Sequence, residues 1–191
     1  MIPVCNQSGV LPPFLPGVSP IEPGAMAPYR VSLLDVAHRY ATSDERLKIL
    51  KGFLTYREEL RLLGFDQGFQ WIDGSFVENI EANSGRPPRD IDLITFAHRP
   101  FQYTDNDVWR AFLETRSDLF NPELSKGRYF CDAYFVDMTS HPRYLINQTK
   151  YWFGLFSHQR ETYLWKGMLE IPLCDDTEVA AFLSGGGSNA A

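Results

Sequence analysis

A helical repeat of apolar residues is the strongest pattern in the chain. Between residues 47 and 63, leucine and phenylalanine recur at mainly helical spacing until Gly64 interrupts the pattern. Thr42 and Ser43 both offer an N-cap, and Glu45 completes a capping box with Thr42. These signals predict a long amphipathic helix that stops at Gly64, preceded by a short helix over residues 32–40.

Short apolar and aromatic segments alternate with further helical patterns along the rest of the chain. They predict strands over residues 69–73, 90–96, 128–138 and 168–173. Helices are expected over residues 105–115, 143–158 and 175–182, with a helical turn at 76–80 and a loop at 82–89. The chain is therefore expected to combine several short strands with several helices.

Both ends of the chain differ in composition from its centre. Residues 1–28 contain seven prolines, which fix φ and lack an N–H, so they predict an extended, non-helical arm. Because this arm carries apolar residues such as Leu11 and Phe14, we expect a strap over the core, with a partner-binding tail as the alternative. The expected domain covers residues 29–183, followed by a disordered tail over 184–191.

Composition narrows the class of protein. The chain has 191 residues, 44% of them hydrophobic and 22% charged, which is typical of one globular domain. A net charge of −6 argues against bulk binding to DNA, because nucleic-acid-binding proteins present a basic face. Three cysteines form no CxxC pair, and no apolar run approaches a membrane span or a signal peptide. We expect a cytoplasmic protein with no membrane contact.

The candidate chemistry lies between residues 71 and 96. Asp90 and Asp92 are two residues apart in a predicted strand, so they project from the same face. Two neighbouring carboxylates repel each other, and a hard cation such as Mg²⁺ removes that conflict. Gly74, followed by Ser75, allows the backbone to approach a ligand closely, and N–H groups there can surround an anion. The combination suits phosphoryl or nucleotidyl transfer.

This pattern, Gly74-Ser75 followed by Asp90-Ile91-Asp92-Leu93, resembles the signature of the polymerase-beta-like nucleotidyltransferase superfamily. In that superfamily an apolar strand, Gly-Ser or Gly-Gly and a helix precede an Asp-x-Asp strand, and a third carboxylate follows on a later strand. Residues 9–13 and 165–168 are also similar to a short bacterial branch of the superfamily. The resemblance implies an α+β, nucleotidyltransferase-like fold from about residue 45 to 173, with a small mixed β-sheet flanked by helices.

The resemblance also implies roles for individual residues. Asp90 and Asp92 would hold the Mg²⁺ ion that binds the triphosphate, and would share a second Mg²⁺ with the third carboxylate. Ser75 and the backbone of Gly74 would contact the phosphates. Arg89 would also meet phosphate, or would pair with Asp90 instead.

Two residues compete for the role of third carboxylate. Asp132 and Asp137 lie five residues apart in one predicted strand, and hence on opposite faces. Asp132 lies mid-strand between apolar neighbours, as the superfamily's third acid does, whereas Asp137 lies near the strand end and can cap the turn at Thr139. We favour Asp132.

Asp73 and the aromatic helix over residues 144–156 are both interpreted as structural rather than functional. Asp73 precedes the glycine and is interpreted as a turn-capping residue. The aromatic helix over residues 144–156 is interpreted as core, with nucleobase stacking by Tyr151 or Trp152 as the alternative.

The expected function is therefore a Mg²⁺-dependent nucleotidyltransferase that moves a nucleotide from an NTP such as ATP to a hydroxyl on a protein, RNA or small molecule. Small relatives of the fold work in toxin–antitoxin or phage-defence pairs, so a partner protein is also expected by analogy. The alternatives are a non-catalytic module that binds a nucleotide or a partner, and a phosphohydrolase that uses the same metals.

Overall fold

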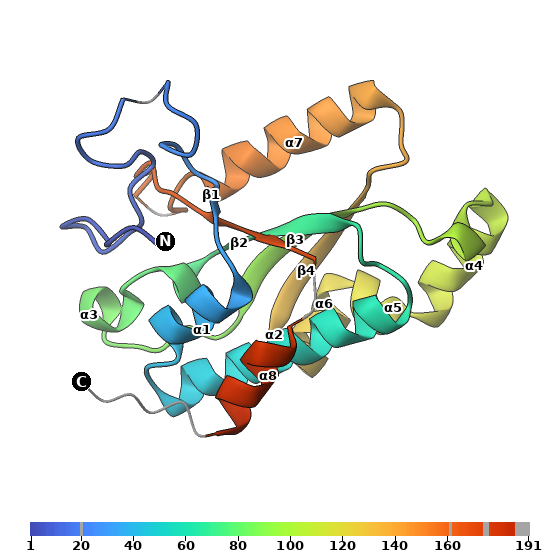
Figure 1. Ribbon diagram of the computed structural model, residues 1–191, viewed down its shortest axis with the longest axis horizontal. Helices are drawn as coiled ribbons and strands as arrows, with labels where there is room; N and C mark the ends of the chain where they lie inside the picture. Colours follow the sequence, from blue (N-terminus) through green and yellow to red (C-terminus); the bar gives the residue numbers. More distant parts are fainter. Residues whose placement is uncertain (20, 161, 174–175, 186–191) are drawn as a thin grey trace.

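A mixed β-sheet runs through the centre of the molecule in the strand order β1-β5-β2-β3-β4 (Figure 1). The computed structural model describes residues 1–19, 21–160, 162–173 and 176–185. Within these ranges the strands are β1 (Tyr29–Arg30), β2 (Gly68–Asp73), β3 (Ile91–Ala97), β4 (Cys131–Asp137) and β5 (Leu169–Pro172). β2 is antiparallel to both β3 and β5, whereas β3 pairs with β4 and β1 pairs with β5 in parallel. The expected small mixed sheet flanked by helices is confirmed.

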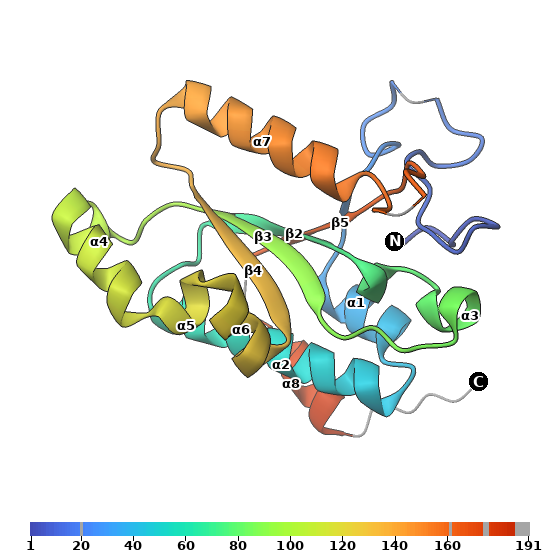
Figure 2. The same ribbon diagram turned by 180° about the vertical axis from the view of Figure 1, so that it is seen from behind.

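Helices cover the two faces of this sheet unequally (Figures 1 and 2). One face carries α1 (Leu33–Tyr40), α2 (Asp44–Leu62), α4 (Asn106–Thr115), α5 (Ser117–Phe120), α6 (Pro122–Tyr129) and α8 (Thr177–Ser184). The opposite face carries α7 (Pro142–Phe156). The connections contain α3 (Ile80–Ser84) and two 3₁₀ turns, η1 (Ser75–Val77) and η2 (Phe101–Tyr103).

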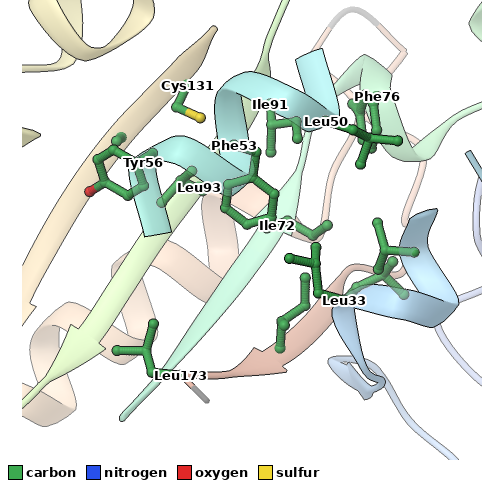
Figure 3. Close-up of a cluster of buried hydrophobic side chains, with 14 of the residues drawn as sticks. Leu33, Leu50, Phe53, Tyr56, Ile72, Phe76, Ile91, Leu93, Cys131 and Leu173 are labelled. Carbon is green, nitrogen blue, oxygen red and sulfur yellow. The ribbon is translucent and has the colours of Figure 1, made fainter. Parts of the chain in front are cut away.

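The larger core lies between the sheet and α2. Phe53 and Tyr56 of α2 are fully buried together with Ile72, Leu93 and Cys131, which come from β2, β3 and β4 (Figure 3). Side chains alternate along a strand, so the residues between these point to the other face. Both faces of β2 and β3 therefore carry apolar side chains, and both faces are buried.

The smaller core lies under α7. Trp71 of β2 and Ile94 of β3 are buried there with Trp152 and Phe156 of α7. Trp152 lies with its ring centroid 4.6 Å from that of Tyr134 on β4. For Trp152, the structure therefore confirms the expectation that the aromatic side of this helix is core.

The N-terminal ends of the first two helices are capped by serine. Ser32 and Asp35 form a capping box at α1, as the expected helix over residues 32–40 requires. The long helix α2 is also confirmed, but its N-cap is Ser43, whose hydroxyl accepts a hydrogen bond from the N–H of Arg46. The capping box expected between Thr42 and Glu45 is therefore wrong by one residue.

The segment before β4 differs most from the expectation. The strand begins at Cys131 rather than at residue 128, because the preceding residues form α6. Asn121 caps α6, Pro122 takes its first turn, and Phe130 ends the helix with a left-handed φ of 57°. These short helices, α5 and α6, lack a long apolar repeat, so the periodicity of the sequence did not reveal them.

The N-terminal arm contributes to the core. Val10 and Leu11 are buried, and Leu11 belongs to the larger apolar cluster. The backbone carbonyl of Leu11 accepts a hydrogen bond of 2.7 Å from the N–H of Gly167, and the Tyr29 hydroxyl donates to the carbonyl of Pro12 at 2.8 Å. These contacts favour a strap over a free tail.

The other end of the chain is described only in part. The last helix, α8, extends to Ser184, so it overlaps the start of the expected tail, and residues 186–191 lie outside the described ranges. Among the helices that the structure describes, each is too short or too polar to cross a bilayer.

Candidate functional site: an acidic row beside a glycine turn

Aspartates from three adjacent strands stand in register at one end of the sheet. Asp92 of β3 is the direct partner of Asp73 on β2 and of Asp132 on β4. Residues that are opposite one another in a sheet project from the same face. Asp90 lies two residues before Asp92, immediately ahead of β3, and Lys126 contacts both Asp90 and Asp132. The predicted trio of Asp90, Asp92 and Asp132 is therefore brought to one place.

The charges of this cluster act most strongly on Asp92. Burial, together with the negative charges of Asp90 and Asp132, raises the pKa of Asp92 to about 6, against smaller opposing effects of Lys166 and Lys126. The carboxylates thus share a site where a full set of negative charges is unfavourable. Such a site favours a cation or a bound proton.

Gly74 brings its backbone directly against Asp92. Its φ of 80° and ψ of −167° lie in a region that is essentially restricted to glycine. A Cβ atom placed on Gly74 would overlap the carboxylate of Asp92. The turn leads into η1, which begins with the partly exposed Ser75. The two residues expected to contact phosphate, Gly74 and Ser75, therefore lie next to an expected metal ligand.

Asp73 is a buried ion-pair partner rather than a turn-capping residue alone. Its carboxylate lies 3.0 Å from the ammonium of Lys166, and Lys166 lies 2.8 Å from Glu78, beyond the η1 turn. All three side chains are buried. Burial raises the pKa of Asp73 to about 7, although Lys166 and the N–H of Gly74 act in the opposite direction. One oxygen of Asp73, Oδ1, has no hydrogen-bond partner among the described residues.

Lys166 therefore joins the two ends of the turn that contains Gly74 and Ser75. Burial lowers the pKa of Lys166, but the charges of Asp73 and Glu78 outweigh it, so the net shift is upward and the group stays charged. Local patterns could not place this lysine, because its partners are 88 and 93 residues away along the chain. It lies in the segment 165–168 that carries part of the family resemblance.

A second buried cation holds the outer side of the same turn. Arg46 of α2 donates hydrogen bonds to the carbonyls of Phe76 at 2.7 Å and Glu78 at 2.9 Å. It also forms a two-point ion pair with Glu81 of α3, at 2.6 and 2.8 Å. The turn is thus fixed from both sides by buried positive charges, which holds its backbone in place beside Asp92.

Asp137, the rejected alternative for the third carboxylate, has a structural role. It receives a hydrogen bond of 2.6 Å from Arg99 on one oxygen. Its other oxygen accepts from the N–H and the hydroxyl of Thr139, as the expected turn cap would. Asp132, by contrast, lies in register with Asp92, and its role as the third carboxylate stays a prediction.

The remaining predicted site residues lie at the edge of the cluster. Arg89 is exposed next to Asp90, but the ion pair described for Asp90 is with Lys126. Tyr151 is 59% exposed on α7 and contacts the buried Trp152 edge-on. Burial raises the pKa of Tyr134, and the charge of Asp132 and a hydrogen bond with it add to this rise. An aromatic surface therefore adjoins Asp132.

The donor set fits a hard cation in its chemistry. Asp90, Asp92 and Asp132 offer carboxylate oxygens, which Mg²⁺ prefers, and the cluster contains no sulfur or imidazole donor among the residues described above. As the side chains stand, no three His, Cys, Asp or Glu groups in the described part of the chain converge tightly enough to form a ready metal site.

Residues 3–172 match the family of unknown function DUF6932, and the chain therefore belongs to that family. The match includes the N-terminal arm, the acidic row, the glycine turn and Lys166. Comparisons with curated proteins and with solved structures gave no match.

Proposed function

We propose that this protein is a Mg²⁺-dependent nucleotidyltransferase with a polymerase-beta-like fold and an N-terminal proline-rich strap. The single observation that carries the proposal is the position of Asp92, which lies between Asp132 in register on β4 and the glycine-restricted turn at Gly74. A metal-binding carboxylate beside a tight backbone turn suits a nucleotide whose phosphates bind both.

Each residue of the site has a defined task in this proposal. Asp90, Asp92 and Asp132 hold the ions, while the backbone of Gly74 and the hydroxyl of Ser75 contact the phosphates. Mg²⁺ held by these acids would supply positive charge that stabilises the attacking and leaving oxygens. Arg89 stands exposed next to Asp90 and can reach phosphate from the solvent side.

Several classes of molecule are candidates for the acceptor of the nucleotide. In the reaction, an acceptor hydroxyl attacks the α-phosphorus of an NTP such as ATP, and the bond to pyrophosphate breaks. We propose an acceptor on a protein, an RNA or a small molecule, and a toxin–antitoxin or phage-defence setting in the cytoplasm. The net charge of −6 favours a small or protein acceptor over a long nucleic acid.

Transfer of label from α-³²P NTPs tests this proposal. Purified protein is incubated with Mg²⁺, each NTP and a panel of acceptors, and the wild type is expected to form a labelled adduct. The double variant Asp90→Ala, Asp92→Ala and the single variant Asp132→Asn should lose at least 100-fold in rate. Asp107→Asn, an exposed acid on α4, is the matched control and should keep full activity.

Two results would reject the transferase. Equal labelling by the wild type and the double variant would show that the acids are not catalytic. Release of free phosphate or nucleotide without an adduct would identify a phosphohydrolase.

A non-catalytic binding module is the second candidate, and one observation favours it. A groove of about 840 Å³ runs along one side of α7, and its lining includes the apolar residues Leu145, Ile146, Phe153 and Trp165. Exposed apolar surface of this kind often marks a protein interface. Calorimetry would then show binding of an NTP or a partner without any product. Turnover that depends on Asp132 would exclude this candidate.

A further inference from the structure

Two lysines contact the acidic region, and their environments differ sharply. The side chain of Lys166 is 3% exposed, and it lies within 3.0 Å of both Asp73 and Glu78. The side chain of Lys126 on α6 is 51% exposed, and its ammonium contacts Asp90 and lies 3.9 Å from Asp132. Lys166 is fixed by its buried partners, whereas Lys126 is free to leave its partners for solvent or for another anion.

Lys126 binds oxygens that a divalent cation would also use. Its ammonium is a compact positive charge on a flexible four-carbon stem, and it approaches Asp90 and Asp132 from the β4 side of Asp92. The lysine side of this pair is half-exposed, so its ammonium can exchange the carboxylates for water or another anion. A doubly charged ion at the same carboxylates repels the ammonium and outcompetes it for their oxygens.

The side from which Lys126 approaches the acids determines which part of a bound nucleotide its ammonium could contact. The Gly74 turn lies on the β2 side of Asp92, and Lys126 lies on the β4 side. If the turn holds the outer phosphates, the phosphate that reacts lies over Asp92 and Asp132, within reach of Lys126. Lysine is a common point-charge ligand of phosphate.

We propose that Lys126 exchanges its carboxylate partners for the α-phosphate of the nucleotide when Mg²⁺ and NTP bind. This inference rests on the proposed nucleotidyltransferase function and adds one nucleotide-binding residue to it. Lys126 thus competes with the metal ion when no nucleotide is present, and assists nucleotide binding when the metal ion is bound. Metal and nucleotide consequently bind better together than separately.

Binding of Mn²⁺, measured by electron paramagnetic resonance, tests the exchange without any need for catalysis. Lys126→Met removes the competing ammonium, so Mn²⁺ alone should bind about 10-fold more tightly than to the wild type. In saturating Mg²⁺, a non-hydrolysable ATP analogue with an α,β-methylene bridge should bind about 10-fold more weakly, as measured by calorimetry. The opposite signs of the two shifts are the signature of the exchange, because general damage to the site would weaken both.

Two further variants separate the possible failures. Arg128→Met, on the same helix but paired with Asp118, is the matched control and should change neither affinity. Asp90→Asn and Asp132→Asn should weaken Mn²⁺ binding, and if they do not, the proposed metal site itself is wrong. If those acids matter but Lys126→Met binds Mn²⁺ no more tightly than the wild type, the exchange alone is overturned. Lys126→Arg keeps the charge and should resemble the wild type in Mn²⁺ binding.

Discussion

At the scale of single residues, Asp92 is the carboxylate on which the neighbouring charges of the site act most strongly. It lies between two other strand aspartates and against the backbone of Gly74. Burial, together with Asp90 and Asp132, raises its pKa to about 6. We therefore expect the stability of the folded protein to depend on pH and on added cations, and both effects can be measured.

The raised pKa of Asp92 predicts that stability falls as pH rises. A carboxyl group with a higher pKa in the folded than in the unfolded state binds more protons when folded. Its stabilising effect is therefore complete below the unfolded pKa of about 3.9 and is lost as pH rises through about 6. We expect this group to lower the free energy of unfolding by roughly 2–3 kcal/mol between pH 4 and pH 7.

Urea unfolding at a series of pH values checks this prediction. Asp92→Asn should remove its own part of the decline and leave the part that comes from the raised pKa of Asp73, while Asp107→Asn on exposed α4 should leave the whole decline intact. Millimolar Mg²⁺ should also flatten the decline, because a bound cation favours the ionised carboxylate. The same slope in Asp92→Asn and in the wild type would contradict the assignment.

The Gly74 turn predicts a strong penalty for any side chain. Gly74→Ala combines a backbone conformation that alanine avoids with overlap of the Asp92 carboxylate. We expect a loss of about 1–3 kcal/mol in the free energy of unfolding, measured with urea. Gly127→Ala is the matched control, since open space surrounds this glycine of α6. There the substitution should stabilise the protein by roughly 0.5–1 kcal/mol. Equal effects at both positions would show that the turn tolerates a side chain.

At the scale of elements, Arg46 connects α2 to the η1 turn and to α3. It is buried, and its guanidinium binds two backbone carbonyls and the carboxylate of Glu81. Arg46→Met leaves those acceptors without their donor. We expect a loss of about 3 kcal/mol in the free energy of unfolding, because removing one partner of a buried ion pair is costly. Thermal and urea unfolding provide the measurement.

An exposed ion pair supplies the comparison for Arg46. Arg110 and Asp107 form a pair on the surface of α4, where both side chains are mostly exposed. Arg110→Met should cost less than about 1 kcal/mol. A similarly small effect for Arg46→Met would mean that the η1 turn does not depend on α2.

At the scale of the whole molecule, the N-terminal strap closes one side of the fold. Leu11 is buried in the larger core and its carbonyl is bonded to Gly167, just before β5. Leu11→Ala should therefore cost about 2–4 kcal/mol of stability, as expected for a core leucine. Val4, by contrast, is 78% exposed, and Val4→Ala should stay within about 0.5 kcal/mol of the wild type. A partner-binding tail that is independent of the core would show little effect at both positions.

The sequence predicted much of the local structure because local structure follows local spacing. The helical repeat in 44–62 and the apolar segments that became β2, β3 and β4 lie close to their expected places. Helices α5 and α6 were not predicted, because a helix of eight or fewer residues carries too little periodicity. The separation of Asp132 from Asp137 onto opposite faces followed from the two-residue period of a strand alone.

What the sequence determined by itself is the pair Asp90 and Asp92 after a glycine turn, and the placement of Asp132 and Asp137 on opposite faces of a later strand. Only the tertiary structure placed Asp73 in register with Asp92, and Lys126 and Lys166 against these acids. Strand pairing and buried ion pairs join residues that are tens of positions apart, so no local pattern records them. The acids could be recognised from the sequence, but the cations that balance them are defined by how the chain folds.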